Sequence, residues 1–260
     1  MQVAVITGAG SGIGLACARR FADMGMSIVG VGRDAEKLAT MEAQIADPER
    51  VATVAVDITA DEAPRQIVDC AVSRWGRIDF LINNAGIGRP KPLHETDDAT
   101  LDYCLGLMLR APFRLAREAL PHMRPGSAII NVTSTYAVVG GLRGGAYSAA
   151  KAGLTGLTTH IACQYGPAGI RANAVAPGVV PTPMTEGRLD DEKFRRVNIE
   201  MTPYPRLGTV DDIVGTIAFL CSPDGSFING QTIVVDGGWS STKYLSERAL
   251  TTTWIDPEPK

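Results

Sequence analysis

Two hydrophobic patterns alternate along the chain. Short apolar runs rich in valine, isoleucine and alanine are typical of parallel strands that are buried on both faces of a sheet. Between them, apolar residues recur at three- and four-residue spacing, which is typical of helices that pack along one side. The runs predict strands at Val3 to Thr7, Ser27 to Gly32, Val51 to Val56, Ile78 to Asn83, Ala128 to Thr133, Ile170 to Ala176 and Thr232 to Val235.

Helical patterns follow most of these strands. They predict helices at Leu15 to Met24, Ala35 to Ala46, Asp61 to Trp75, Leu101 to Met123, Ala146 to Tyr165 and Val210 to Leu220. Pro112 predicts a bend in the fourth of these helices, because proline has no backbone N–H to donate. Strands that alternate with helices over the whole length predict an α/β fold, a single doubly wound parallel sheet (Rossmann fold) of about seven strands with helices on both faces.

A glycine-rich turn, Thr7-Gly8-Ala9-Gly10-Ser11-Gly12-Ile13-Gly14, joins the first strand to the first helix. Glycines allow the backbone to approach a pyrophosphate, and a helix N-terminus supplies free N–H groups and a positive dipole. The glycines that set the spacing are Gly8, Gly12 and Gly14, which differs from Gly-x-Gly-x-x-Gly. The turn indicates a phosphate-binding site for a nucleotide.

No linker, internal repeat or low-complexity segment divides the sequence. We therefore expect one dinucleotide-binding domain over residues 1–238, followed by a C-terminal tail at 239–260 without clear periodicity. Within the domain, we expect residues 183–206 to form a mobile, polar loop beside the substrate.

The end of the second strand bears on the choice of cofactor. An acidic residue at this position accepts from the 2′-hydroxyl of NAD, whereas an arginine accommodates the 2′-phosphate of NADP. Gly32 is taken as the strand end and Arg33 follows it, which favours NADP(H). NAD(H) stays possible if Asp34 occupies the strand end, and a third interpretation makes Asp34 only the N-cap of the next helix.

Tyr147 and Lys151 are four residues apart at the start of a predicted helix, so their side chains share one helix face. The unperturbed pKa of tyrosine is about 10. An ammonium at ~4 Å attracts a phenolate by about 4 kcal/mol at an effective dielectric of ~20, so we expect a lowered pKa for Tyr147. Tyr147 would then donate and accept protons. The alternative is that Tyr147 and Lys151 are only a half-buried surface pair. The nucleotide-site motifs upstream favour a catalytic role for the pair.

Composition excludes several classes of function. A net charge of -3 and a pI of about 5.7 leave no basic surface for nucleic acid or an anionic membrane. No apolar run approaches the ~20 residues of a membrane span, and the N-terminus lacks a signal-peptide pattern, so we expect a cytoplasmic protein. The 5 cysteines and 3 histidines are scattered without ligand spacing. We expect no metal and no disulfide framework.

These motifs together carry a family resemblance. From Val3 to Gly238 the chain resembles the short-chain dehydrogenase/reductase family. The matching residues, in order, are Thr7-Gly8 through Gly14, Asp57, Asn83-Asn84-Ala85-Gly86, Ser134, Tyr147, Lys151, Asn173 through Gly178, Thr182 and Asp236-Gly237-Gly238.

The resemblance implies a role for each matching position. Ser134, Tyr147 and Lys151 are the implied catalytic residues, with Ser134 holding the substrate oxygen beside Tyr147. The implied cofactor residues are Gly8, Ser11, Gly12, Ile13 and Gly14 at the phosphates, Arg33 at the adenosine end, Asp57 and Ile58 at the adenine, Asn84, Ala85 and Gly86 at the ribose, Tyr147 and Lys151 at the nicotinamide ribose, and Pro177, Gly178, Val180 and Thr182 near the carboxamide.

One position departs from the family. Members commonly carry an asparagine about 39 residues before the tyrosine, thought to hold a water that relays protons to the lysine. Here that position is Met108, and a thioether is at best a weak acceptor. The relay uses another group, or turnover is slower, or the alignment slips by a residue.

The resemblance implies hydride transfer between the nicotinamide C4 and a secondary alcohol or ketone, with Tyr147 as general acid/base. A non-catalytic dinucleotide-binding regulator, suggested by Met108, is the alternative. Arg143 or Arg89 would meet an anionic substrate, but the favoured interpretation of each is a solvated surface arginine. The family also implies a homotetramer or homodimer. The expected substrate residues are Ser134, Tyr136, Leu142, Tyr147, Met184 and Tyr204, which indicate a moderately apolar site.

Overall fold

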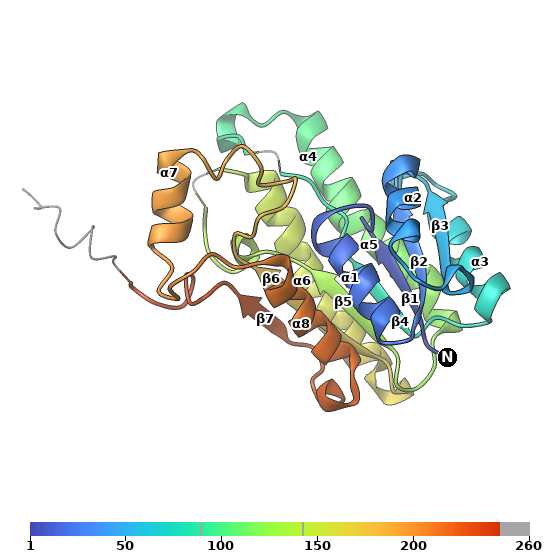
Figure 1. Cartoon of the computed structure of the whole chain (residues 1–260). Coiled ribbons are helices and arrows are strands. Elements are labelled where there is room, and N and C mark those ends of the chain that lie inside the picture. The colour runs from blue at the N-terminus through green and yellow to red at the C-terminus, as the bar shows by residue number, and fades with distance from the viewer. Residues whose placement is uncertain (89, 142, 245–260) are drawn as a thin grey trace, which may run out of the picture.

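A parallel sheet forms the centre of the structure, a computed structural model that describes residues 1–88, 90–141 and 143–244 (Figure 1). The seven strands in these residues have the order β3-β2-β1-β4-β5-β6-β7, and each neighbouring pair is parallel. The direction of winding reverses between β1 and β4, and open α/β sheets bind ligands at such a point. The strands are β1 (Val3–Thr7), β2 (Ser27–Gly32), β3 (Val51–Ala55), β4 (Phe80–Asn83), β5 (Ala128–Val132), β6 (Arg171–Pro177) and β7 (Thr232–Val235).

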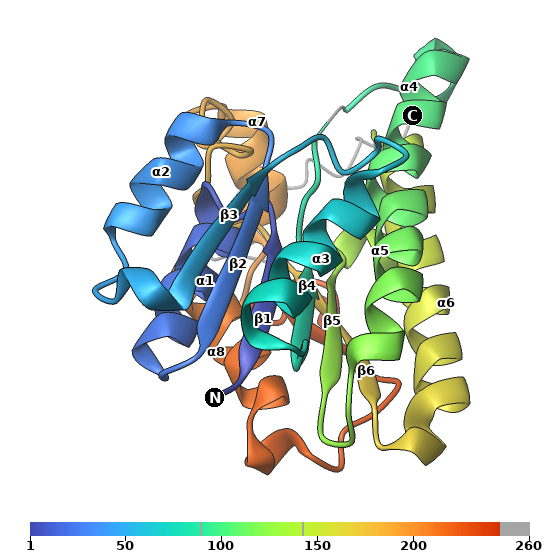
Figure 2. The ribbon, with the colours of Figure 1, turned by 90° about the vertical axis from the view of Figure 1, so that its right-hand side faces the viewer.

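Helices cover both faces of the sheet, as Figure 2 shows. One layer contains α1 (Gly12–Asp23), α2 (Ala35–Ala43) and α8 (Val210–Cys221), and the other contains α3 (Ala63–Trp75), α4 (Asp98–Leu105), α5 (Ala111–Ala119) and α6 (Gly145–Tyr165). Successive strand side chains point to opposite faces, so Val3 and Val5 join one core and Ala4 and Ile6 join the other. The predicted doubly wound α/β fold is confirmed. None of the helices in the described residues is long and apolar enough to cross a membrane.

The helix predicted from Leu101 to Met123 is interrupted. Its middle is a π-helical turn over Gly106–Arg110, and α5 begins at Ala111 directly after it. Pro112 is the second residue of α5, so the position without an N–H comes directly after the π-helical turn. The predicted bend is therefore a π-helical turn that precedes the proline.

Residues 183–206, expected as a mobile, polar loop, are helical in part. This segment contains α7 (Glu192–Arg195) and a π-helical turn over Arg196–Glu200. Asp191 caps α7, because its carboxylate accepts from the N–H of Phe194 at 2.8 Å. Figure 1 shows α7 at the end of the molecule toward which the arrowheads of β6 and β7 point.

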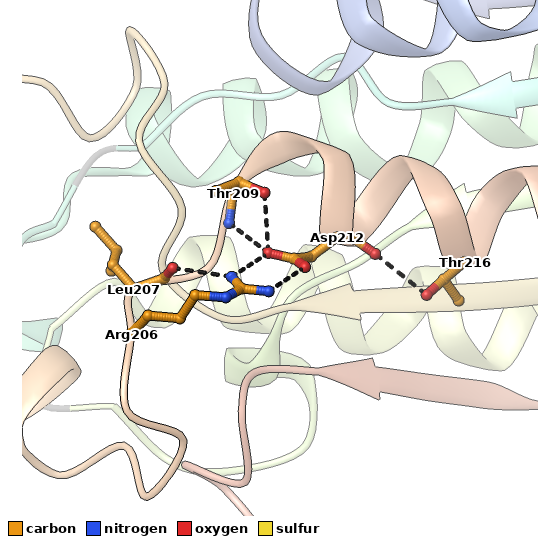
Figure 3. Close-up of polar contacts among 5 residues, drawn as sticks. All are labelled: Arg206, Leu207, Thr209, Asp212 and Thr216. Carbon is orange, nitrogen blue, oxygen red and sulfur yellow. Dashed lines mark hydrogen bonds and ion pairs between the residues drawn. The ribbon is translucent and has the colours of Figure 1, made fainter.

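The same segment ends in a polar junction with α8 (Figure 3). The guanidinium of Arg206 donates to both carboxylate oxygens of Asp212 at 2.7 Å. Asp212 also accepts from the N–H and the hydroxyl of Thr209, which forms a capping box. The Arg206 guanidinium holds the pKa of Asp212 well below its usual range. The junction fixes the end of the segment to the start of α8.

Candidate active site

Two cavities meet at the carboxyl ends of the strands. The first, of about 260 Å³, brings Ser134, Tyr147 and Lys151 together with the glycine-rich turn. The second, of about 480 Å³, shares Gly8 and Ser11 with the first and extends to the end of β2. The cofactor residues expected from the sequence line the first cavity (Gly8, Ser11, Gly12, Ile13, Asn84, Ala85, Gly86, Tyr147, Lys151, Pro177, Gly178, Val180, Thr182) or the second (Arg33, Asp57, Ile58). Gly14, also expected at the phosphates, lines neither cavity.

The glycine-rich turn needs glycine for two separate reasons. Gly8 has φ of 70° and Gly12 has φ of 52°, in the left-handed region that other residues rarely adopt. At Gly14 a Cβ atom would lie 2.1 Å from the carbonyl oxygen of Gly8. Ser11 is the N-cap of α1 and makes no side-chain cap hydrogen bond, so the first N–H groups of the helix are left for a ligand. The turn fits a bound pyrophosphate.

A threonine and an asparagine join the ends of β1 and β4. The hydroxyl of Thr7 accepts from the backbone N–H groups of Asn84 and Ala85 at 2.9 and 3.1 Å. The side-chain amide of Asn84 donates to the carbonyl oxygen of Thr7 at 2.9 Å. These bonds hold the glycine-rich turn against the loop that follows β4.

The second cavity reaches the end of β2. Gly32 is the last residue of this strand, and Arg33 donates to the hydroxyl of Tyr103 at 3.0 Å. The carboxylate of Asp34 caps α2 by accepting from the N–H groups of Glu36 and Lys37, each at 3.1 Å. Asp34 is therefore the N-cap of the helix that follows β2, as the third interpretation has it. Arg33 is the charged residue next to the strand end.

Lys151 lies at the floor of the first cavity, where its side chain is buried. Its ammonium donates to the carbonyl oxygen of Val132, the last residue of β5, at 2.7 Å. The same ammonium lies 5.9 Å from the ring centroid of Tyr147. Ser134 accepts from the N–H of Tyr136 at 3.1 Å, and a hydrogen bond links the side chains of Ser134 and Tyr147. The three expected catalytic side chains are thus neighbours.

The expected direction of the Tyr147 pKa is wrong for the protein alone. Burial raises the pKa of Tyr147 above its usual value of 10, and the hydrogen bond from Ser134 offsets this only in part. Burial also lowers the pKa of Lys151 from 10.5 to about 8. Removal from water therefore outweighs the hydrogen bond from Ser134, and Tyr147 is a neutral phenol at pH 7.

A chain of buried polar groups positions the helix that carries Tyr147 and Lys151. The amide of Asn83 on β4 donates to the side-chain oxygen of Asn131 on β5 at 2.8 Å. The amide of Asn131 donates in turn to the hydroxyl of Thr158 on α6, also at 2.8 Å. All three side chains are buried, so their partners fix the register of α6 against the sheet.

Two segments form the substrate side of the first cavity. Tyr136 and Met184, both expected from the sequence, line it. Tyr204 does not line it; this side chain lies in an adjoining cavity, with the Arg206 guanidinium 5.2 Å from its ring centroid. Leu142 and Arg89 lie outside the described residues. Arg188, Phe194 and Asn198, which were not singled out by name within the expected 183–206 wall, also line the cavity.

Comparison with known proteins identifies the family. A family model described as enoyl-(acyl carrier protein) reductase matches residues 8–240. The chain is 38% identical to cis-4-hydroxycyclohexanecarboxylate dehydrogenase of Sinomonas cyclohexanicum over 92% of this chain and 97% of that protein. It is 38% identical to levodione reductase of Leifsonia aquatica over 92% of this chain and 94% of that protein. A crystal structure of a short-chain dehydrogenase/reductase from Brucella melitensis, titled glucose/ribitol dehydrogenase, superposes with a TM-score of 0.87 at 36% identity, covering 92% of this chain and 96% of that one.

The chain belongs to the short-chain dehydrogenase/reductase family. It is an enzyme of the kind that oxidises alcohols or reduces ketones, and the family binds nicotinamide cofactors. Among the described residues of this short-chain dehydrogenase/reductase, no group of three or more histidine, cysteine or acidic side chains could hold a metal ion.

Met108 is the one unusual residue of this short-chain dehydrogenase/reductase site. It lies in the π-helical turn and is fully buried. A Cβ atom added to Gly86 would lie 3.4 Å from the Met108 sulfur and 3.6 Å from the Lys151 ammonium nitrogen, so the thioether lies on the same side of Gly86 as the ammonium. The carbonyl of Val132 gives Lys151 the acceptor that Met108 does not supply.

Proposed function

We propose that this enzyme transfers a hydride between the nicotinamide C4 and a secondary alcohol or ketone, with Tyr147 as general acid/base. The observation that carries the proposal is that Ser134, Tyr147 and Lys151 line the same cavity as the glycine-rich turn. In reduction, a hydride donor and a proton donor must meet at the two ends of one carbon–oxygen bond. A cavity shared by the cofactor cradle and a phenol satisfies that requirement.

The bound cofactor supplies or accepts the hydride, and the chain supplies the rest. In reduction, the neutral phenol of Tyr147 donates a proton to the substrate oxygen. Ser134 accepts from the N–H of Tyr136, and its hydroxyl hydrogen would turn from Tyr147 to the substrate oxygen to stabilise negative charge there. In oxidation Tyr147 accepts the alcohol proton, and the Lys151 ammonium stabilises the phenolate that must form first.

We further propose that the preferred cofactor is NADP(H). Arg33 follows the last residue of β2, while the Asp34 carboxylate is occupied by α2 and by the Lys37 ammonium 3.3 Å away. A guanidinium binds a phosphate through charge-assisted hydrogen bonds worth about 1.5–3 kcal/mol. Arg33→Ala is therefore expected to lower kcat/KM for NADPH by about 10- to 100-fold and to leave kcat/KM for NADH within about twofold. Equal losses with both cofactors would exclude contact with a 2′-phosphate.

The direct test titrates NADPH against NADH and then applies a substrate panel with the preferred cofactor. The relatives suggest its members: the names of three include a hydroxycyclohexanecarboxylate, a 3beta-hydroxysteroid and a 3-oxoacyl-[acyl-carrier-protein]. We expect NADPH oxidation with at least one ketone. Tight cofactor binding without turnover on any member would favour the non-catalytic regulator, which the dehydrogenases and reductases among the relatives do not favour.

We also propose that the enzyme is a homotetramer. Large apolar side chains are exposed on its helical faces, Phe113 on α5 at 48% and Phe219 on α8 at 41%. Such residues are typical of surfaces that are covered in an assembly. Light scattering coupled to size-exclusion chromatography would give four times the chain mass of 27.5 kDa; the mass of one chain would contradict the proposal.

A further inference from the structure

The charged side chains among the described residues that line the first cavity are all positive. Its described lining residues include three cations, Arg143, Arg188 and Lys151, and no acidic side chain. Lys151 is buried and bound to the Val132 carbonyl, whereas the two arginines are more exposed. Cations concentrated in a cleft attract anionic ligands, because no neighbouring carboxylate neutralises the field.

The two arginines also lack ionic partners in the part of the chain that the structure describes. Neither guanidinium forms an ion pair or a side-chain hydrogen bond with any described residue, whereas other arginines of the 183–206 segment are engaged. Arg206 is held by both oxygens of Asp212 (Figure 3), and Arg196 lies 2.9 Å from the carboxylate of Glu192. Neither of the two arginines that line the cavity has a carboxylate partner among the described residues.

The two arginines line the same cavity as Ser134 and Tyr147. Arg143 lies four residues before Tyr147, at the turn that leads into α6. Arg188 comes from the other wall; its guanidinium nitrogen would be 3.6 Å from a Cβ added to Gly88, past the end of β4. The side chains of Met184 and Phe194 line the same cavity and are apolar.

We propose that the substrate is anionic: a hydroxy or keto acid whose reacting oxygen lies at Ser134 and Tyr147 and whose carboxylate binds Arg188 and Arg143. This inference rests on the function proposed above. A guanidinium presents a planar pair of donors that matches a carboxylate. The apolar carbon skeleton between the two ends packs on Met184 and Phe194. The rival ligand for Arg188 is the cofactor pyrophosphate, and the experiment must separate the two.

The test compares acids with their own methyl esters. The probes are 4-oxocyclohexanecarboxylate and 4-oxopentanoate, each with its methyl ester, under saturating cofactor. The wild-type enzyme is expected to reduce at least one acid with a kcat/KM about 10-fold or more above that of its ester, since a charge-assisted hydrogen bond is worth at least that factor. Because the carboxylate is remote from the reacting carbon, the difference should lie in KM.

Substitution assigns the effect to the arginines. Arg188→Gln is expected to raise KM for the acid about 10-fold and KM for the ester less than about twofold. Because Arg143 is more exposed than Arg188, Arg143→Gln is expected to raise KM for the acid only severalfold. Arg195→Gln is the matched control, because Arg195 lies on α7 in the same segment, is exposed and does not line the cavity. Raising the salt concentration should weaken binding of the acid and leave the ester unchanged.

Three results would count against the proposal. Equal kcat/KM for acids and esters would refute the anionic substrate while leaving the proposed oxidoreductase in place. An Arg188→Gln enzyme with a raised KM for NADPH and an unchanged KM for the acid would assign this residue to the cofactor. If no ketone at all is reduced, the proposed function itself fails. In that case calorimetry measures the affinity of the acids for wild-type and Arg188→Gln enzyme, each saturated with NADPH. Weaker binding to Arg188→Gln would support the anion site, and equal affinities would refute it.

Discussion

Lys151 carries a stability cost that the structure allows to be measured. Burial lowers its pKa from 10.5 to about 8, which at about 1.4 kcal/mol per pKa unit corresponds to a cost of about 3 kcal/mol. Below pH 8 the lysine is protonated in both states, and the folded state bears the whole cost. Between pH 8 and 10.5 the unfolded state binds more protons than the folded state, so the cost disappears as the pH rises.

Replacement of Lys151 by methionine removes this pH dependence. The variant also leaves the Val132 carbonyl without its donor, a loss of about 1–3 kcal/mol that is the same at every pH. The wild-type protein should therefore gain about 3 kcal/mol in unfolding free energy relative to Lys151→Met as the pH rises from 7 to 10.5. For a chain of this size, that corresponds to a relative change of about 6–12 °C in Tm.

The assay is urea denaturation of cofactor-free protein at several pH values. Lys193→Met is the matched control, since Lys193 is exposed on α7 and its replacement corrects for the general effect of losing one charge. Unfolding free energies of wild type and Lys151→Met that run parallel across this pH range would show that Lys151 keeps an ordinary pKa. The account of the cavity floor would then be wrong.

Further predictions concern the proton donor, the unusual residue and the α8 junction. In cofactor-free enzyme, the phenolate absorbance of wild type minus Tyr147→Phe should show no ionisation below pH 10, because burial raises this pKa; a step near pH 7 would contradict it. Met108→Asn should change kcat less than about threefold, because Lys151 already has an acceptor; a tenfold gain would show that the thioether limits proton transfer. Asp212→Ala should lower the unfolding free energy by about 1–2 kcal/mol in thermal denaturation, because it removes the capping box and the Arg206 pair, whereas an unchanged Tm would mean that the junction adds nothing.

The sequence was sufficient to predict the order of strands and helices and the cavity residues that lie next to them. The apolar runs predicted β1, β2 and β7 to the residue. Gly8, Ser134 and Tyr147 follow strand ends or begin helices, so parallel pairing alone brings them to one edge of the sheet. The local sequence pattern is therefore sufficient to predict most of the residues that line the cofactor side of the cavity.

Other features depend on contacts between distant parts of the chain. Arg188 and Phe194 line the cavity because of how residues 183–206 fold back, and Tyr204 lies in an adjoining cavity for the same reason. The expected pKa of Tyr147 had the wrong direction because spacing reveals the neighbouring ammonium but not the burial of both groups. The capping aspartate at 191 was the one local signal that could have revealed α7.

The most direct test of the central claim is turnover by Tyr147→Phe. The substitution removes the hydroxyl that would donate the proton and keeps the ring that packs beside Lys151. With the best ketone of the panel, we expect NADPH to bind with an unchanged Kd and the single-turnover rate to fall by about 10²- to 10⁴-fold, the usual contribution of a general acid. A Tyr147→Phe enzyme that keeps wild-type rates would show that another group supplies the proton.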